Sequence, residues 1–409
     1  MRKVLLIEAM GSAEDLLDAG RELGVEVVVA THREIYESYS PALKQKIAAT
    51  VFTDFSDQDG ALKDLAAYAR AEGIDAVVGC WEFLTPLAAR LSAELGLPGN
   101  DPERAAGCRN KRVMAGLFEE HGVPAPRTLL AADLESAISA LAASGLEYPV
   151  VVKPAEQAGS WGVSVVDGPD EFPAAFAGAQ GWPFESPHGF PLDTTVLIQE
   201  YVGGVEYSVE SVAYQGRVIP LTVVQKFTTD GVFRAETGQT VPAALSDEDT
   251  RTLYDTTIAA VRALGITDGV AHTELKLLPG GHAKIIEVGA RLPGDRVPEL
   301  IRLASGVNEA RAFIQVALGI TPELTPTKDE AAAIRFFVPP RAGRFKSIDG
   351  LVRSPQVHRI AVYPNPHDEV RGPGDNDGRV GYVMLRARTP EKVNKAADAA
   401  VANLTVELE

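Results

Sequence analysis

Two glutamates on either side of a glycine turn are the residues of this sequence best suited to bind a metal ion. The segments Thr273–Leu278 and Lys284–Val288 read as two strands joined by a turn. With Gly280-Gly281 as a two-residue hairpin loop, the register places Glu274 directly opposite Glu287. Like charges placed in this way destabilise a strand pair, and a cation between them removes the penalty. The pair predicts a Mg²⁺ site completed by phosphate oxygens; the alternative is two glutamates on a solvated strand face.

Three other features are suited to a nucleotide. Lys153 ends an apolar run, and the loop Glu156–Gly162 follows it with glycines that let backbone N–H groups approach an anion. The Walker pattern G-x-x-x-x-G-K-[ST] is absent from this loop. Arg291 has a planar guanidinium that matches phosphate oxygens. The connector Ile198–Glu206 is suited to offer backbone groups to adenine and the Glu206 carboxylate to ribose hydroxyls. Taken singly, each feature also fits an ordinary hairpin, connector or surface residue.

The elements that must position these residues begin with a βαβ pattern in the first hundred residues. Apolar runs read as strands, and the amphipathic stretches between them read as helices, at Val4–Ile7, Ala13–Leu23, Val25–Val29, Gly60–Glu72, Ala76–Val78 and Leu84–Leu95. This alternation predicts an open parallel sheet with helices on both faces. The first turn, Glu8–Ser12, lacks G-x-G-x-x-G, so we expect a Rossmann-like domain without a nicotinamide cofactor.

Four units are expected along the chain, because domains usually hold about 100–200 residues. The boundaries fall in breaker-rich or connecting segments, giving units at 1–102, 103–199, 200–325 and 326–409. Within the third unit, Gln215-Gly216 predicts a hairpin between strands at Val205–Tyr214 and Arg217–Val224. Residues 181–193, rich in proline, glycine and aromatics, predict an irregular loop.

The composition argues against several classes of partner. The 409 residues carry a net charge of −17, which opposes the basic surface that nucleic-acid binders need. No segment approaches the roughly 20 apolar residues of a membrane span, and Glu8 interrupts the N-terminal apolar run before any signal-peptide cleavage site. Cys80 and Cys108 lack metal-ligand spacing and favour a reducing compartment. We therefore expect a cytoplasmic protein without membrane or nucleic-acid partners, and a homodimer is compatible with this expectation.

In their order along the chain the motifs resemble the ATP-grasp superfamily, and specifically its carboxylate–amine ligase branch, which includes L-amino-acid (dipeptide-forming) ligases. The motifs are Cys108-Arg109-Asn110-Lys111, Val152-Lys153-Pro154, the loop 156–162, Gln199–Val202 with Gly204-Val205-Glu206, His272-Thr273-Glu274 and Glu287–Arg291. Together they cover nearly the whole chain. The resemblance implies a mixed α/β and α+β architecture. A Rossmann-like N-terminal domain would precede the small and large lobes of an ATP-grasp fold, and a small α+β subdomain would follow them.

The resemblance also implies a role for each motif. Lys111 and Lys153 would hold the α- and β-phosphates of ATP, and the loop with Gly159, Ser160 and Gly162 would close over the β- and γ-phosphates. The remaining implied ATP ligands are the segment Glu200, Tyr201 and Val202 at adenine, Glu206 at ribose, and Lys226. Glu274 and Glu287 would hold Mg²⁺, with Mn²⁺ as an alternative. Arg291 would stabilise the transferring phosphoryl group, which makes Arg291, Lys153 and Glu287 the implied catalytic residues.

Two departures from the branch concern the substrate and the metal. Gln239 stands where the pattern after Lys226 usually has a histidine, and Gly289 stands where many ATP-grasp enzymes have an asparagine. The first leaves the substrate open, and the second implies a thinner metal shell. Candidate substrate ligands are Glu236 for an ammonium, Arg296 for a carboxylate, and Gln239, Arg291 and His272 beside them. His272 is equally readable as a support for Glu274 or as an ordinary strand histidine.

The function implied by the resemblance is an ATP-dependent ligase. It would activate a small carboxylic acid, such as an amino acid, as an acyl phosphate and join it to an amine, releasing ADP and phosphate. One alternative is a purine-pathway or biotin-carboxylase-like ATP-grasp enzyme. Another is a nucleotide-binding regulatory protein without turnover.

Overall fold

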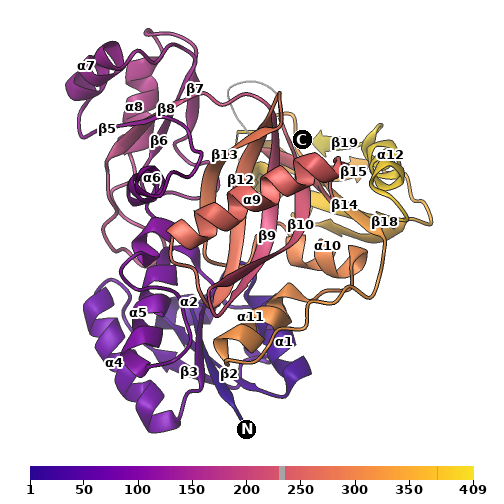
Figure 1. Ribbon diagram of the computed structural model, residues 1–409. Helices are drawn as coiled ribbons and strands as arrows, with labels where there is room; N and C mark the ends of the chain where they lie inside the picture. The colour runs from indigo at the N-terminus through magenta and orange to yellow at the C-terminus, as the bar shows by residue number, and fades with distance from the viewer. Residues whose placement is uncertain (230–234, 375) are drawn as a thin grey trace.

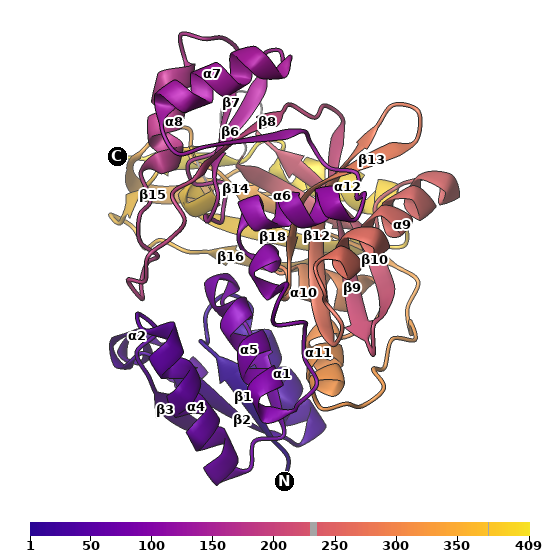
Figure 2. The same ribbon diagram turned by 60° about the vertical axis from the view of Figure 1, so that its left-hand side comes forward.

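The computed structural model describes residues 1–229, 235–374 and 376–409, arranged as four sheets with helices around them (Figure 1). A small lobe lies above the large central sheet, and the N-terminal domain lies below it (Figure 2). The predicted α/β and α+β architecture, with an N-terminal parallel α/β domain and a C-terminal α+β subdomain, is confirmed.

The N-terminal domain is built on a parallel sheet of order β3-β2-β1-β4. Its elements are β1 (Lys3–Ile7), α1 (Ala13–Leu23), β2 (Glu26–Thr31), α2 (Arg33–Ser38), α3 (Pro41–Lys44), β3 (Ala49–Phe52), α4 (Gln58–Glu72), β4 (Ala76–Gly79), a 3₁₀ turn at Glu82–Leu84 and α5 (Thr85–Leu95). Alternate residues of β1 face opposite cores: Val4 and Leu6 pack with α1, whereas Leu5 and Ile7 pack with α4 and α5. Burial on both faces explains why the strands read as continuous apolar runs. The predicted sheet is confirmed, but α2, α3 and β3 were not predicted, because these segments are short and half-exposed.

A buried polar network fills the carboxyl edge of this sheet, between β1 and β2. Glu8 accepts hydrogen bonds from the Thr31 hydroxyl (2.9 Å), from Tyr39 and from His188 Nε2 (2.8 Å). His188 also contacts Glu185 at 3.1 Å. Both residues belong to the segment 181–193, which descends from the small lobe (Figure 2). The segment is the irregular loop that was predicted. Its buried His188 contacts Glu185 through Nδ1 and Glu8 through Nε2, and the second contact holds the loop on the N-terminal domain.

The small lobe contains an antiparallel sheet of order β5-β8-β6-β7. It includes a 3₁₀ turn (Ala105–Cys108), α6 (Lys111–Glu120), β5 (Thr128–Ala131), α7 (Leu134–Ser144), β6 (Val150–Pro154), β7 (Ser164–Val166), α8 (Phe172–Gln180) and β8 (Val196–Glu200). The helices α7 and α8 bury one face of this sheet around Val150, Val152 and Ile198. The antiparallel pairing of β6 with β7 is the hairpin expected around the loop 156–162.

The large central sheet has eight strands, in the order β13-β12-β9-β10-β11-β14-β18-β16. The large lobe supplies β9 (Val205–Tyr214), β10 (Arg217–Thr228), β11 (Glu236–Val241), α9 (Asp247–Ala263), β12 (Gly269–Leu278), β13 (His282–Gly289), α10 (Val297–Ala304) and α11 (Glu309–Ala317). The predicted β9–β10 hairpin is confirmed, and Gln215 and Gly216 both have positive φ, as a type I′ turn requires. Helix α11 crosses to the N-terminal domain, where Phe313 and Val316 share a core with α1.

The C-terminal residues extend the same sheet. They form β14 (Ala331–Phe337), β15 (Gly343–Asp349), β16 (Val357–Val362), β17 (Glu369–Val370), a 3₁₀ turn (Asn376–Gly378), β18 (Gly381–Ala387), α12 (Pro390–Val401) and β19 (Thr405–Leu408). Strand β14 pairs with β11 of the large lobe, so the expected boundary at 325–326 lies between two units that share one continuous sheet. A second sheet, β17-β15-β19, lies beside α12 (Figure 1).

Candidate functional site

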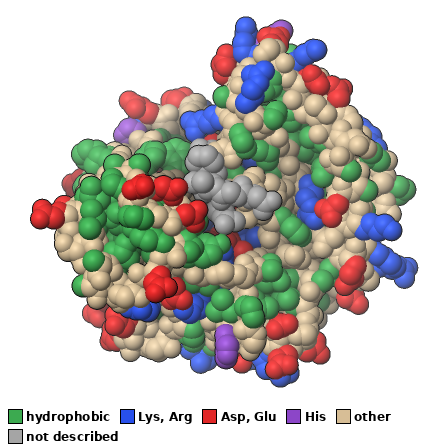
Figure 3. Space-filling view, turned by 90° about the horizontal axis from the view of Figure 1, so that it is seen from above, with side chains coloured by type: hydrophobic (Ala, Val, Ile, Leu, Met, Phe, Trp, Pro, Cys, Tyr) green, Lys and Arg blue, Asp and Glu red, His purple; other side chains and the backbone are tan. Residues whose placement is uncertain are grey.

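A cavity of about 450 Å³ lies where the small lobe faces the large sheet. Seen from above, the molecule is hollowed in this region (Figure 3). Every one of the four units contributes to the lining, which includes Glu82, Lys111, Lys153, the segment 157–161, Glu200–Val202, Glu206, Lys226, Glu236, His272, Glu274, Ile286, Glu287, Arg291 and Asn376. The structure thus brings most of the predicted site residues together.

The two expected metal glutamates lie directly opposite each other in the β12–β13 ladder, as predicted. The predicted reason was wrong in one detail. The connection has three residues, because Leu278 pairs with His282, and a β-bulge between Glu274 and Leu275 shifts the register by one. The bulge leaves Ile286 as the extra residue, and both Ile286 and Glu287 line the cavity. A bulge that re-aims a side chain is a common device beside functional sites.

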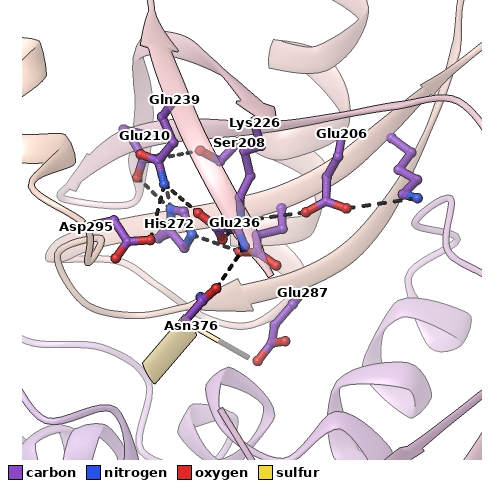
Figure 4. A network of polar contacts seen from close by, with 12 residues as sticks. Glu206, Ser208, Glu210, Lys226, Glu236, Gln239, His272, Glu287, Asp295 and Asn376 are labelled. Carbon is purple, nitrogen blue, oxygen red and sulfur yellow. Dashed lines mark hydrogen bonds and ion pairs between the residues drawn. The ribbon is translucent and has the colours of Figure 1, made fainter. Parts of the chain in front are cut away.

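Each of these glutamates is neutralised by a lysine that was expected to bind ATP. Lys111 Nζ lies 2.8 Å from Glu287 Oε1 and donates to the carbonyl of Gln157. Lys226 Nζ lies 2.5 Å from Glu274 Oε1 and 2.7 Å from Glu236 Oε1 (Figure 4). The opposed carboxylates are therefore held by cations, which is the electrostatic condition that the facing pair requires.

The donor set suits a hard cation. Glu274 and Glu287 present two carboxylates to one cavity, a common protein contribution to a Mg²⁺ site whose other ligands are phosphate oxygens and water. Within the described residues, no group of three or more His, Cys, Asp or Glu side chains is arranged to hold a metal ion. A magnesium ion at this pair would therefore depend on nucleotide oxygens for most of its ligands.

His272 supports Glu274 from the strand side. Its Nδ1 lies 2.9 Å from Glu210 Oε1, and its Nε2 lies 3.2 Å from Glu274 Oε1. Burial alone would lower the pKa of His272, but the Glu210 and Glu274 carboxylates outweigh it and raise the pKa to about 10. His272 is thus a charged bridge between two carboxylates. These contacts favour the reading of His272 as a support for Glu274.

Lys153 is buried at the end of β6, and its side-chain amine makes no hydrogen bond or ion pair within the described part of the chain. Burial and the neighbouring Lys111 lower the pKa of Lys153 to about 8, against the opposing effect of Glu287, Glu274 and Glu206. A negatively charged ligand beside this amine would therefore stabilise its protonated form.

A first prediction follows for the pH dependence of ATP binding. Phosphate favours the charged amine, so ATP affinity should be highest below pH 8. It should fall by up to about tenfold per pH unit above pH 8, as Lys153 of the free protein loses its proton. Calorimetric titration with a non-hydrolysable ATP analogue between pH 6.5 and 9.5 measures this slope. Lys153→Met should bind more weakly and lose the slope, whereas Lys346→Met, on exposed β15, should keep it. An equal slope in Lys153→Met would contradict the assignment.

Arg291 is held by a glutamate from the N-terminal domain that was not predicted. Glu82 Oε2 accepts from Arg291 at 2.6 and 2.9 Å, and Glu82 Oε1 lies 3.7 Å from Arg109. Burial would raise the pKa of Glu82, but Arg291 and Arg109 outweigh it and hold the pKa at about 2. The Arg109 guanidinium lies 3.6 Å from the centre of the Phe83 ring and has no hydrogen-bond partner within the described residues.

The opposite end of the cavity is apolar, as a base-binding end requires. Val151, Val163, Val165 and Ile286 line it together with Tyr201 and Val202. The Glu200 side chain does not face a ligand, because Lys284 binds it at 2.7 and 2.8 Å. Glu206 lies between Lys226 (3.6 Å) and Lys276 (3.9 Å). This end of the cavity therefore has apolar walls, and the Glu206 carboxylate lies where a ribose is expected.

The loop 156–162 borders the cavity between these two ends. Gly159, Ser160 and Gly162 have φ values of +64°, +64° and +72°, so the chain here is in a conformation that favours glycine. Trp161 packs against Trp182, with ring centroids 4.9 Å apart. The loop is thus anchored by this aromatic contact and by the hydrogen bond from Lys111 to Gln157, while its backbone lies along the cavity.

A second prediction concerns this loop. A non-hydrolysable ATP analogue should slow hydrogen exchange of residues 156–162, because backbone N–H groups that meet phosphate oxygens are withdrawn from solvent. Exchange mass spectrometry with and without the analogue makes the comparison. The β12–β13 turn, Pro279–Gly281, lies outside the cavity lining and serves as the internal reference. Equal exchange of the loop in both states would argue against its role as a cover.

The expected substrate residues are only partly in the cavity. Glu236 lines it, but Lys226 and Gln239 Nε2 (2.6 Å) already bind its carboxylate. Burial raises the pKa of Glu236 to about 7, with Lys226 opposing the shift. Gln239 is buried behind it, with its Oε1 unpartnered within the described residues. The expectation that Arg296 faces the substrate is wrong: its guanidinium lies over the Tyr382 ring at 5.1 Å and pairs with Glu299, outside the cavity lining.

Comparison with family models gives three matches along the chain. A model described as an ATP-grasp domain matches residues 146–299. An ATP-grasp N-terminal domain matches residues 17–99, and an L-amino acid ligase C-terminal domain 2 matches residues 335–409. Among the described helices, none is long and apolar enough to cross a membrane.

Individual proteins show the same likeness. Alanine–anticapsin ligase of Bacillus subtilis is 25% identical over 71% of this chain and 66% of its own length. Carnosine synthase 1 of Homo sapiens is 27% identical over 81% of this chain and 41% of its own length. The chain thus spans less than two thirds of both relatives. The crystal structure of an L-amino acid ligase from Bacillus licheniformis superimposes with a TM-score of 0.82 at 23% identity, covering 100% of this chain and 99% of its own.

Proposed function

The chain belongs to the ATP-grasp superfamily, and from this premise we propose that it is a carboxylate–amine ligase for a small acid, such as an amino acid. The observation that carries the proposal is the facing pair Glu274 and Glu287, which lies on the floor of a cavity that also holds Lys111, Lys153 and Arg291. This arrangement surrounds a nucleotide's phosphates with cations at one end and leaves room for a second small molecule beside Arg291. The L-amino acid ligase match at residues 335–409 supports the branch.

The proposed reaction has two steps. A carboxylate oxygen of the acid attacks the γ-phosphorus of ATP, and the bond from that phosphorus to the β–γ bridging oxygen breaks, releasing ADP. The amine nitrogen then attacks the acyl carbon, the carbon–oxygen bond to phosphate breaks, and the amine loses a proton. Both steps place negative charge on phosphoryl oxygens, and fixed cations in a dry site stabilise that charge. Magnesium, when bound with ATP, would supply further charge stabilisation and hold the β- and γ-phosphates in line.

The chain's own residues are assigned as follows. Lys111 and Lys153 hold the α- and β-phosphates, and the loop 156–162 excludes water that would hydrolyse the acyl phosphate. Arg291 binds the transferring phosphoryl group, and Glu82 orients Arg291 from the N-terminal domain. The adenine end uses Tyr201 and Val202, with Glu206 at ribose.

The phosphate end contains an exchange of partners. Lys111 and Lys226 neutralise Glu287 and Glu274 in the structure. If these two glutamates hold magnesium, they would release both amines, which would then be free to bind the phosphates of ATP. Metal and nucleotide should therefore bind cooperatively. The metal would replace the lysines as the partner of the glutamates, and the phosphates would replace the glutamates as the partner of the lysines.

A screen of amino-acid pairs for phosphate release, with mass spectrometry of the products, tests the proposal. We expect ADP and phosphate formation only when an acid and an amine are both present, together with an amide product. Turnover that depends on bicarbonate or formate instead would favour a purine-pathway or biotin-carboxylase-like reaction. ATP binding without ADP formation under any pair would favour a regulatory nucleotide-binding protein. Glu287→Gln serves as the inactive control in each assay.

A further inference from the structure

The C-terminal subdomain supplies Asn376 to the cavity lining, and Arg379 lies behind it. Arg379 precedes β18, and its side chain is 13% exposed. It binds both carboxylate oxygens of Asp295, at 2.7 and 2.9 Å, and donates from Nε to the carbonyl of Asn376 at 2.8 Å. Its guanidinium also lies 4.1 Å from the centre of the Phe336 ring. Two charge-assisted bonds, a carbonyl bond and an aromatic face fix this side chain on all sides.

Both partners of Arg379 belong to segments that form the cavity wall. Asp295 lies four residues after Arg291, and its Oδ2 lies 3.4 Å from Gln239 Nε2 (Figure 4). Asn376 lines the cavity, and its Oδ1 accepts the backbone N–H of Glu236 at 2.8 Å. One side chain therefore connects the loop after Arg291, the start of β11 and the C-terminal subdomain.

The loop that carries Asp295 needs such a support. Asp295 and Arg296 both have positive φ, at +54° and +61°. Two consecutive non-glycine residues in this region are strained, and they persist only where the surroundings determine the conformation. The bidentate contact from Arg379 holds the Asp295 side chain, together with a longer contact from Gln239 Nε2 at 3.4 Å, whereas Arg296 lies outside the cavity lining.

We propose that Arg379 is a positioning residue for the acid-binding end of the active site: it fixes Asp295 and Asn376, and through them the placement of Arg291, Glu236 and Gln239. The inference rests on the proposed ligase function and concerns the acid, because within the described residues Arg379 makes no hydrogen bond or ion pair with the adenine and ribose walls. Its loss should therefore change the handling of the acid while leaving nucleotide binding in place. Lysine should not replace it, since an ammonium cannot bind both Asp295 oxygens and lie flat on Phe336.

Steady-state kinetics of Arg379→Ala and Arg379→Lys, with ATP and acid varied separately, tests the proposal. We expect KM for the acid to rise at least tenfold in both variants, with KM for ATP within about twofold of wild type. In a double-mutant cycle, Asp295→Asn should add little to Arg379→Ala, because the two changes remove the same contact. Arg344→Ala removes an exposed arginine from β15 of the same subdomain, and should leave both KM values unchanged.

The outcomes separate this inference from the proposed function. If the wild-type protein turns over no acid and amine, the proposed function fails. Hydrogen exchange then still tests whether Arg379 holds Asp295 and Asn376 in place. Residues 293–297 and 236–239 should then exchange faster in Arg379→Ala than in wild type. In an active protein, an unchanged KM for the acid, an equal rise of both KM values, or full recovery by lysine would overturn the inference. Thermal unfolding of each variant shows whether a general loss of stability accounts for the change.

Discussion

Replacing Glu287 by glutamine is expected to lower kcat/KM by about 100- to 1000-fold, or roughly 3–4 kcal/mol of transition-state stabilisation. The amide keeps the size of the side chain but removes its charge from a pair that faces Glu274 across the ladder. In the proposed site these two carboxylates would supply the protein's share of the magnesium ligands, so losing one should weaken the charge stabilisation at the phosphates. It also leaves Lys111 without the carboxylate that it holds at 2.8 Å. Magnesium-dependent ADP formation, followed with a coupled assay, gives the comparison.

The control for this prediction is Glu323→Gln, which makes the same chemical change at an exposed position that pairs with Arg311. It should keep wild-type kinetics. Raising the magnesium concentration should recover part of the Glu287→Gln loss if the defect is metal affinity. Wild-type turnover by Glu287→Gln at limiting magnesium would remove the basis for the assigned metal site.

Replacing Arg291 by alanine should reduce kcat by at least about 100-fold while changing KM for ATP only a few-fold. The guanidinium lines the same cavity as Glu274 and Glu287, the glutamates proposed to hold magnesium, so its contribution is expected in the transition state of phosphoryl transfer. Arg291→Lys should recover little, because a planar fork binds two oxygens and an ammonium does not. Single-turnover measurement of ADP formation separates this chemical defect from substrate binding.

Two comparisons make the Arg291 prediction specific. Arg311→Ala, at a half-buried position on α11 outside the cavity lining, should keep both kcat and KM. Removal of Arg291 also leaves Glu82 without its main partner in a buried site, so thermal unfolding should be measured alongside. A variant that retains kcat but loses ATP affinity would assign Arg291 to ground-state nucleotide binding instead.

The parts of the fold that follow from local patterns could be predicted from the sequence. The alternation of buried strands and helices in residues 1–100 and the Gln215-Gly216 hairpin signal both led to the observed elements. The facing of Glu274 and Glu287 was also predicted, but two errors cancelled. The turn is one residue longer than expected, and the bulge restores the register. A bulge leaves no clear mark in a single strand's sequence, because it depends on the partner strand.

The residues that were missed reach the site through tertiary packing. Glu82 follows β4 at the carboxyl edge of a parallel sheet, a place where ligands often bind, and this signal was available. Asn376 and Arg379 lie in the connection between β17 and β18, and nothing in the sequence of this connection indicates that it contacts the large lobe. The same limit explains the error at Arg296, since only the packing of Tyr382 shows that the arginine turns away and that Asp295 turns inward.

The continuous sheet has a consequence for attempts to exchange parts of this protein. A cut at 325–326 would strip β14 from Gly238–Val241 of β11, exposing an unpaired edge in the middle of the eight-stranded sheet. It would also remove Arg379 and Asn376 from the wall of the cavity. The C-terminal residues therefore cannot serve as a cassette to be grafted between enzymes by themselves. A functional chimera would have to take β11, with Glu236 and Gln239, from the same parent as β14 and the segment around Arg379.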